Sequence, residues 1–180
     1  MGARVALVDV EANRPIIDVT HIEPRITLRT KAIIAVHLNG RAAAMGEINR
    51  IARKHGLRVI EDAVQSLASK NAEELLGTQS DLGSFSLSVA KIISTGQGGF
   101  VVTKDEATHQ KLKLIRKHGV SDVVNASWTE LVFNFRLTGL LTSIGVVQVT
   151  KLVERIAKVK AIFARYAAAM PGFPSWSLSP

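Results

Sequence analysis

The chain has 180 residues, of which 47% are hydrophobic and 21% charged, and it contains no cysteine. This composition is typical of one globular domain, and it excludes a disordered tail, a fibrous rod, disulfide bonds and thiolate metal sites. The net charge of +8 is spread along the chain without a run of five like charges, and aromatic residues make up only 5%, so nucleic-acid binding is disfavoured.

The first part of the chain predicts alternating strands and helices. A valine-rich run at residues 5–10 predicts a buried strand, and residues 18–24 predict a turn and a short helix that a proline limits. Residues 32–37 predict a second buried strand, which is followed by a turn signal at Asn39 and Gly40.

A parallel βαβ unit is predicted next. Apolar side chains at helical spacing predict a helix over residues 42–55, with Gly56 as its C-terminal cap. Residues 57–60 predict a third strand, which ends in Glu61 and Asp62. Because strand, helix and strand follow one another, the two strands are expected to be parallel with a right-handed crossover.

Two more strands are predicted at residues 83–88 and 98–103, joined by a loop that carries Lys91. A helix then extends from Lys104-Asp105 to about His118, where Gly119 is a stop signal.

The last part is expected to be irregular over residues 120–136 and helical over residues 138–169, with the helix continuous or broken once. Three prolines, at positions 171, 174 and 180, end it. The whole pattern predicts an α/β fold, with a mostly parallel sheet and helices on both faces. Ligands of such sheets bind at the carboxyl ends of the strands, so residues there are the candidates for chemistry.

Lys91 and Asp62 are the first two candidates. Small and apolar neighbours surround Lys91, and desolvation favours the neutral amine that forms a Schiff base. The alternative is a surface lysine, which is far commoner for a lysine chosen at random. Asp62 closes an apolar strand, where a buried carboxylate needs a cationic partner such as a pyridinium nitrogen. The alternative for Asp62 is a helix N-cap, which is the commoner role for an isolated Asp.

Ser86 and His37 are weaker candidates. The Ser86 hydroxyl either binds a phosphate or satisfies a strand end, and His37 is more often a hydrogen-bonded histidine than a catalytic one. Residues 96–99 form a glycine cluster that suits an anion cradle or a tight turn.

Several classes are excluded or disfavoured by missing patterns. The histidines lack metal-ligand spacing, and there is no G-x-S-x-G motif, so neither a zinc site nor an α/β-hydrolase nucleophile is expected. No apolar run reaches the roughly 18 residues of a membrane span, and the N-terminus lacks a signal peptide's apolar core. The sequence therefore predicts a cytoplasmic protein that does not contact membranes.

Four motifs follow one another in a single order: EDAVQ at residues 61–65, FSL at 85–87 with Lys91 soon after, TGQGG at 95–99, and NFRLT at 134–138. Together they resemble the DegT/DnrJ/StrS family of pyridoxal-phosphate-dependent sugar aminotransferases. The resemblance extends from Gly2 to about Tyr166. It implies the large domain of fold-type I pyridoxal phosphate (PLP) transferases, incomplete at both ends.

The resemblance implies a role for each motif residue. Lys91 is similar to the lysine that forms the Schiff base with PLP, and Asp62 to the carboxylate that pairs with the pyridine nitrogen. Gln65 matches a glutamine near the cofactor ring, and Ser86 matches a serine that contacts the cofactor phosphate. Asn134 matches an asparagine that reaches the phosphate in the neighbouring subunit's site, which implies a homodimer.

The implied substrates are a nucleotide-linked keto sugar and an amino donor such as glutamate or glutamine, with His37 and Arg136 as candidate substrate contacts. Lys91 favours transamination over the related sugar 3-dehydratases, which have histidine at that position. Gln97 and Asn39 depart from the family pattern, which usually has Glu and often an aromatic residue there.

The family is about twice this length, so residues 1–137 are expected to be a partial PLP-binding large domain. Residues 138–180 are expected to be a helix and linker toward an absent small domain. The chain is then a truncated aminotransferase, or alternatively a non-catalytic remnant or regulatory module.

Overall fold

The computed structural model describes residues 2–72, 74–117 and 134–170. The chain divides into two compact units. The first combines Met1–Phe85 with Phe100–Arg136, and the second combines Ser86–Gly99 with Leu137–Pro180.

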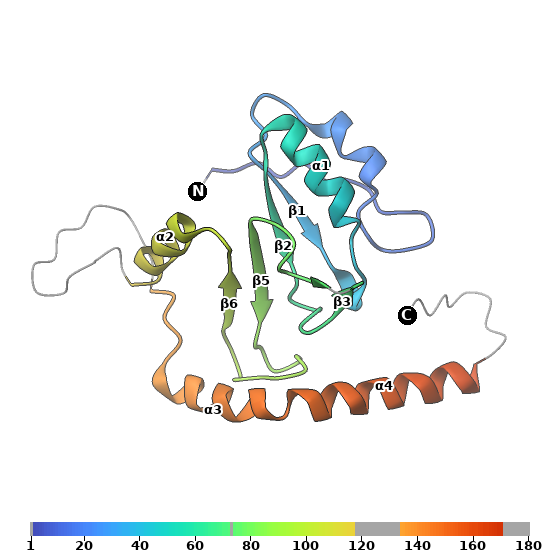
Figure 1. The fold of residues 1–180 in the computed structure, drawn as a ribbon, viewed down its shortest axis with the longest axis vertical. Coiled ribbons are helices and arrows are strands. Elements are labelled where there is room, and N and C mark those ends of the chain that lie inside the picture. Colours follow the sequence, from blue (N-terminus) through green and yellow to red (C-terminus); the bar gives the residue numbers. More distant parts are fainter. Residues whose placement is uncertain (1, 73, 118–133, 171–180) are drawn as a thin grey trace, which may run out of the picture. The chain divides into compact units, whose positions relative to one another are not determined.

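A four-stranded sheet forms the centre of the first unit, in the order β1-β2-β5-β6. Its strands are β1 (Ala32–Val36), β2 (Arg58–Asp62), β5 (Leu82–Ser86) and β6 (Gly99–Val102). The β1–β2 and β2–β5 pairs are parallel, while β6 runs opposite to β5 (Figure 1). The predicted α/β fold with a mostly parallel sheet is confirmed.

Helix α1 (Met45–His55) packs against β1 and β2, and Figure 1 shows it lying over them. Its apolar face and the inward side chains of the strands form the core, which includes Ile33, Ala35, Met45, Ile48, Ile51 and Val59. Gly56 ends the helix in the left-handed conformation, as predicted (φ 64°). The helix begins three residues later than predicted, because the Ala43 amide donates to the His37 ring and not into a helix.

The outer positions of β1 remain open. Ile34 is 59% exposed and Val36 39% exposed, so the described residues cover only one face of this strand. The apolar run of β1 is typical of a strand buried on both faces.

The prediction of a buried strand at residues 5–10 is wrong. Val5 is 84% exposed and Leu7 81% exposed. Among the described residues, this segment pairs through an isolated bridge between Val10 and Ile17. Valine favours extended backbone, but a strand is stabilised only by a neighbour with which it can pair.

Two 3₁₀-helices, η1 (Val19–His21) and η2 (Glu23–Arg25), replace the single short helix predicted at residues 18–24. The Asp18 carboxylate accepts the Thr20 amide and caps η1. Pro24 lies in the first turn of η2, where its missing N–H costs nothing, so it does not limit the helix as predicted.

Other short elements surround the sheet. The predicted turn at Asn39-Gly40 lies in the 3₁₀-helix η3 (Leu38–Gly40), where both residues have positive φ. An antiparallel pair, β3 (Lys70–Asn71) and β4 (Glu74–Leu75), was not predicted.

The remaining helices are α2 (Glu106–Arg116), α3 (Gly139–Thr150) and α4 (Leu152–Ala169). Helices α3 and α4 meet at Lys151, which confirms the predicted helix over residues 138–169 with one break. None of the described helices is long and apolar enough to cross a membrane. His118, Gly119, most of the predicted irregular segment and the three C-terminal prolines lie outside the described residues.

Candidate active site

The carboxyl end of β2 lies between those of β1 and β5. Asp62 is in register with Val36 on β1 and with Ser84 on β5. Backbone bonds continue this pairing past the strands, because the His37 amide donates to the Asp62 carbonyl at 3.0 Å and the Ala63 amide donates to the Ser84 carbonyl at 3.0 Å. Asp62 therefore stands at the central position of the edge where parallel sheets bind ligands.

The Asp62 carboxylate is half-buried and accepts the Val64 amide at 3.2 Å. No helix begins there among the described residues, because the chain turns and the Ser66 amide donates back to the Ala63 carbonyl. The N-cap alternative for Asp62 is therefore wrong. The acceptor capacity of a carboxylate exceeds one hydrogen bond, so Asp62 can accept a cationic donor as well.

Gln65 and Asn39 connect the ends of β2 and β1. The exposed Gln65 side chain accepts the Asn39 amide at 2.9 Å. Asn39 has φ 55°, a left-handed conformation that asparagine tolerates better than an aromatic residue does. This backbone conformation is a physical reason for asparagine at this position.

His37 is fully buried, and both of its ring nitrogens are hydrogen-bonded. Nε2 lies 2.9 Å from Glu61, and Nδ1 accepts the Ala43 amide at 3.1 Å. The structure favours the hydrogen-bonded histidine over the substrate contact, since no ring atom faces solvent.

Glu61 is a residue whose role the sequence analysis missed. It is fully buried, and its carboxylate accepts donors from the loop before β5: the amides of Gly77 (2.7 Å) and Gln79 (2.7 Å) and the hydroxyl of Ser80 (2.9 Å). Burial raises the pKa of Glu61, but these bonds and the one to His37 outweigh it, so the pKa lies below its usual value. Its alternation with buried Val59 was the available signal, because a carboxylate on the core side needs donors.

The carboxylates of this unit predict acid-sensitive stability. The hydrogen bond from Lys54, together with one from His55, lowers the pKa of Glu23 from 4.5 to about 2. A depressed folded-state pKa stabilises the fold above the unfolded value and loses that effect as the pH falls through the folded value. We expect urea midpoints to fall between pH 4.5 and 2, and to fall less for Glu23→Gln. A midpoint that stays constant over this range contradicts the prediction.

The second unit holds Ser86, the last residue of β5, and Lys91, which lies in the loop that follows and that its own hydrogen bonds close. The Ser88 amide donates to the Ser86 hydroxyl at 3.2 Å, and the Lys91 amide donates to the Ser88 carbonyl at 3.0 Å. Lys91 is half-buried. The Leu87 backbone accepts the Thr95 amide and donates to the Gly98 carbonyl, both at 2.9 Å, which confirms the predicted loop between two strands.

Helix α4 holds this loop within the same unit, because the Arg155 guanidinium donates to the Ile92 carbonyl at 2.9 Å. Helix α3 lies close as well: a Cβ added at Gly145 would be 3.2 Å from the Thr95 methyl group. The backbone beside Lys91 is thus fixed by contacts far apart in sequence.

Asn134 and Arg136 lie together on an exposed segment. The Asn134 side-chain Oδ1 atom accepts the Arg136 backbone amide at 3.3 Å and the Arg136 guanidinium Nε at 3.1 Å. The structure thus groups His37, Asp62 and Gln65 in the first unit, Ser86 and Lys91 in the second, and Asn134 with Arg136.

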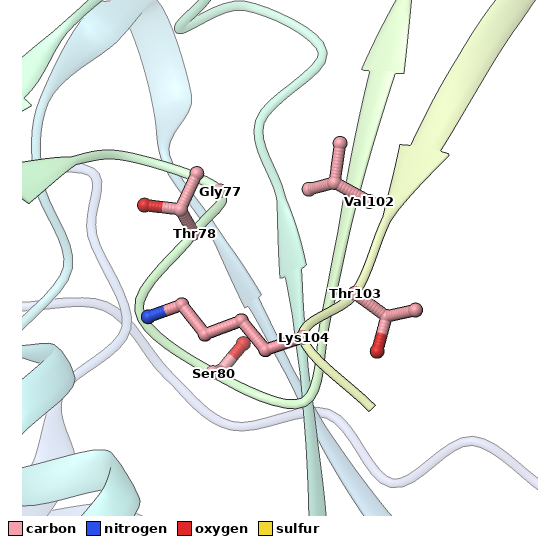
Figure 2. Close-up of a pocket in the computed structure, with 6 residues that line it drawn as sticks. All are labelled: Gly77, Thr78, Ser80, Val102, Thr103 and Lys104. Carbon is pink, nitrogen blue, oxygen red and sulfur yellow. The ribbon is translucent and has the colours of Figure 1, made fainter. Parts of the chain in front are cut away.

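A pocket of about 230 Å³ lies on the loop before β5 and at the end of β6 (Figure 2). It is lined by Gly77, Thr78, Ser80, Val102, Thr103 and Lys104, none of which the sequence singled out as a site residue. Its three hydroxyls donate within the protein, to Leu75, Glu61 and Asp81. Each hydroxyl that lines the pocket therefore already donates its hydrogen within the protein and has none left for a ligand.

The fold is that of the large domain of PLP-dependent aminotransferases, since the solved neighbours of this chain have it. The chain belongs to the DegT/DnrJ/EryC1/StrS aminotransferase family, whose profile matches residues 1–179. GDP-perosamine synthase of Caulobacter vibrioides is 36% identical over 166 residues, which are 92% of this chain and 44% of that protein.

Solved structures share the fold of this chain. Helicobacter pylori PseC, an aminotransferase involved in the biosynthesis of pseudoaminic acid, matches with a TM-score of 0.88 and 28% identity over 94% of this chain and 46% of its own. Spr1654 of Streptococcus pneumoniae, solved in PLP and PMP forms, shares the fold at a TM-score of 0.89 and 22% identity; the match covers 95% of this chain and about half of Spr1654. The chain spans about half the length of the relatives it matches.

Proposed function

We propose that this chain forms part of the large domain of a PLP-dependent aminotransferase that acts on a nucleotide-linked keto sugar, with glutamate or glutamine as amino donor. The observation that carries the proposal is Asp62, a half-buried carboxylate at the carboxyl end of the central parallel strand in a member of this family. The boundary between a large-domain part at residues 1–137 and a helix and linker at residues 138–180 stays a prediction, and so does the cytoplasmic location.

The donor chemistry of the described residues fits this cofactor. Asp62 would accept a cationic pyridine nitrogen, and the exposed Gln65 amide stands three residues later on the same turn. The Ser86 hydroxyl, which donates to the Ser88 hydroxyl at 3.2 Å, would exchange this bond for one to a phosphate. When bound, PLP supplies an electron sink for the substrate carbon that gains or loses the amino group. Lys91 would hold the cofactor through its Nζ atom, and the same amine would move the proton at the substrate carbon.

The substrate class is supported by the relatives, since GDP-perosamine synthase is named for a GDP-linked amino sugar product. Lys91 favours amino transfer over the 3-dehydratase alternative, because a primary amine is what the covalent bond to the cofactor requires. Arg136 is proposed as a contact for an anionic part of the substrate.

Amino transfer distinguishes the enzyme from a non-catalytic module. The chain is incubated with PLP, L-glutamate and GDP- or UDP-linked keto sugars, and the products are identified by mass spectrometry. We expect an amino sugar nucleotide and 2-oxoglutarate in equal amounts. If PLP attaches at Lys91 but no amino sugar forms with any nucleotide keto sugar, the non-catalytic alternative holds for this chain.

We also propose a homodimer, with Asn134 reaching the cofactor phosphate of the neighbouring subunit. Exposed apolar side chains on β1 and on the C-terminal helices, including Ile34, Val146 and Val153, support an apolar interface. Sedimentation at high micromolar concentration is expected to give a dimer or a larger assembly. A folded monomer at that concentration contradicts the proposal.

A further inference from the structure

His37 uses all four of its polar groups at the end of β1. Its amide donates to the Asp62 carbonyl at 3.0 Å, and its carbonyl accepts the Ser66 hydroxyl at 2.6 Å. Its ring bonds Ala43 through Nδ1 and Glu61 through Nε2. One residue thus connects both ends of the turn at residues 62–66 to the first strand and to the segment that leads into α1.

The partners also fix the tautomer of the ring. Because the Ala43 amide can only donate, Nδ1 must present its lone pair, and Nε2 therefore carries the proton that is donated to Glu61. Glu61 is itself immobilised by its three other donors, the Gly77 and Gln79 amides and the Ser80 hydroxyl. A ring held from both sides in a fully buried site has one orientation.

We propose that His37, oriented by Glu61, is a positioning residue that holds the turn at residues 62–66 in the geometry that binds the cofactor. The inference rests on the proposed function, because Asp62 and Gln65 are the cofactor contacts that this turn carries. The ring is fully buried and acts through the backbone, without touching the cofactor.

A purely structural role predicts something different. In that case loss of the ring lowers the stability of the chain, but once the chain is folded its cofactor affinity stays the same. If His37 acts through Asp62, loss of the ring lowers the affinity, and the loss disappears when Asp62 has already been replaced.

The test is a double-mutant cycle on the dissociation constant of PLP, measured by absorbance at a temperature where circular dichroism shows every variant folded. His37→Leu is compared alone and with Asp62→Asn, and His37→Gln retains a donor for Glu61. The control is His55→Leu, another histidine paired with a glutamate (Glu23, 2.7 Å). We expect His37→Leu to weaken binding about tenfold or more, because the turn that carries Asp62 and Gln65 is then no longer held in the binding geometry and must be ordered when PLP binds. His37→Gln should restore most of it, and His55→Leu should leave it unchanged.

Additive effects of His37→Leu and Asp62→Asn, or unchanged affinity in His37→Leu, overturn the inference. Amide hydrogen exchange, measured without cofactor, distinguishes failure of the positioning role from failure of the proposed function. If the parent chain binds no PLP, the proposed function fails, and His37→Leu must still speed exchange at Val64 and Ser66 more than at Val59. Equal exchange at these amides overturns the positioning role.

Discussion

Lys91→Ala is expected to abolish covalent attachment of PLP to the chain. The half-buried Lys91 lies in a loop whose backbone is fixed by hydrogen bonds to Ser88 and by the contact of Arg155 with Ile92. A lysine at a fixed position forms one specific covalent bond, whereas exposed lysines react slowly and without preference. Borohydride reduction in the presence of PLP, followed by peptide mapping, identifies the labelled residue.

Lys111→Ala is the matched control, since it removes an exposed lysine from α2 and should leave labelling unchanged. The assignment of Lys91 is wrong if another lysine carries most of the label, or if Lys91→Ala is labelled as strongly as the parent chain.

Asp62→Asn is expected to keep the fold and to weaken PLP binding roughly tenfold to a hundredfold. The asparagine carbonyl can still accept the Val64 amide, so the turn is retained. In the proposed role the lost carboxylate charge would hold a pyridine nitrogen protonated, and a hydrogen bond to a charged group contributes about 1.5–3 kcal/mol. Affinity is measured by absorbance titration and stability by urea unfolding.

Asp81→Asn is the control for Asp62→Asn, because it is expected to change stability and not cofactor affinity. Burial raises the pKa of Asp81, but the hydrogen bonds from the Val59 amide and the Arg58 guanidinium lower it by more, so the pKa lies below its usual value. This carboxylate therefore stabilises the first unit. We expect Asp81→Asn to lower stability and to leave the affinity of the folded chain for PLP unchanged. Should Asp62→Asn lower stability alone, Asp62 has no part in binding the cofactor.

Local sequence was sufficient to predict those elements whose formation depends on neighbouring residues. Apolar spacing and Gly56 specified α1, because helix periodicity and a left-handed cap are local properties. The βαβ order specified the parallel pairing of β1 with β2, since the crossover has few alternatives. The order of the motifs indicated the family, and the profile over residues 1–179 confirms it.

Tertiary structure alone decided the properties that depend on distant partners. Residues 5–10 have the composition of a strand but lack a neighbouring strand among the described residues, and composition cannot show whether one is available. Asp62 has the identity of a helix cap but is followed by a turn. His37 and Glu61 are 24 positions apart, and only the register of β1 against β2 brings them within 2.9 Å. The sequence therefore determined which side chains stand at the strand ends, and long-range pairing decided which of them are buried in the hydrogen-bonded interior and which can meet a ligand.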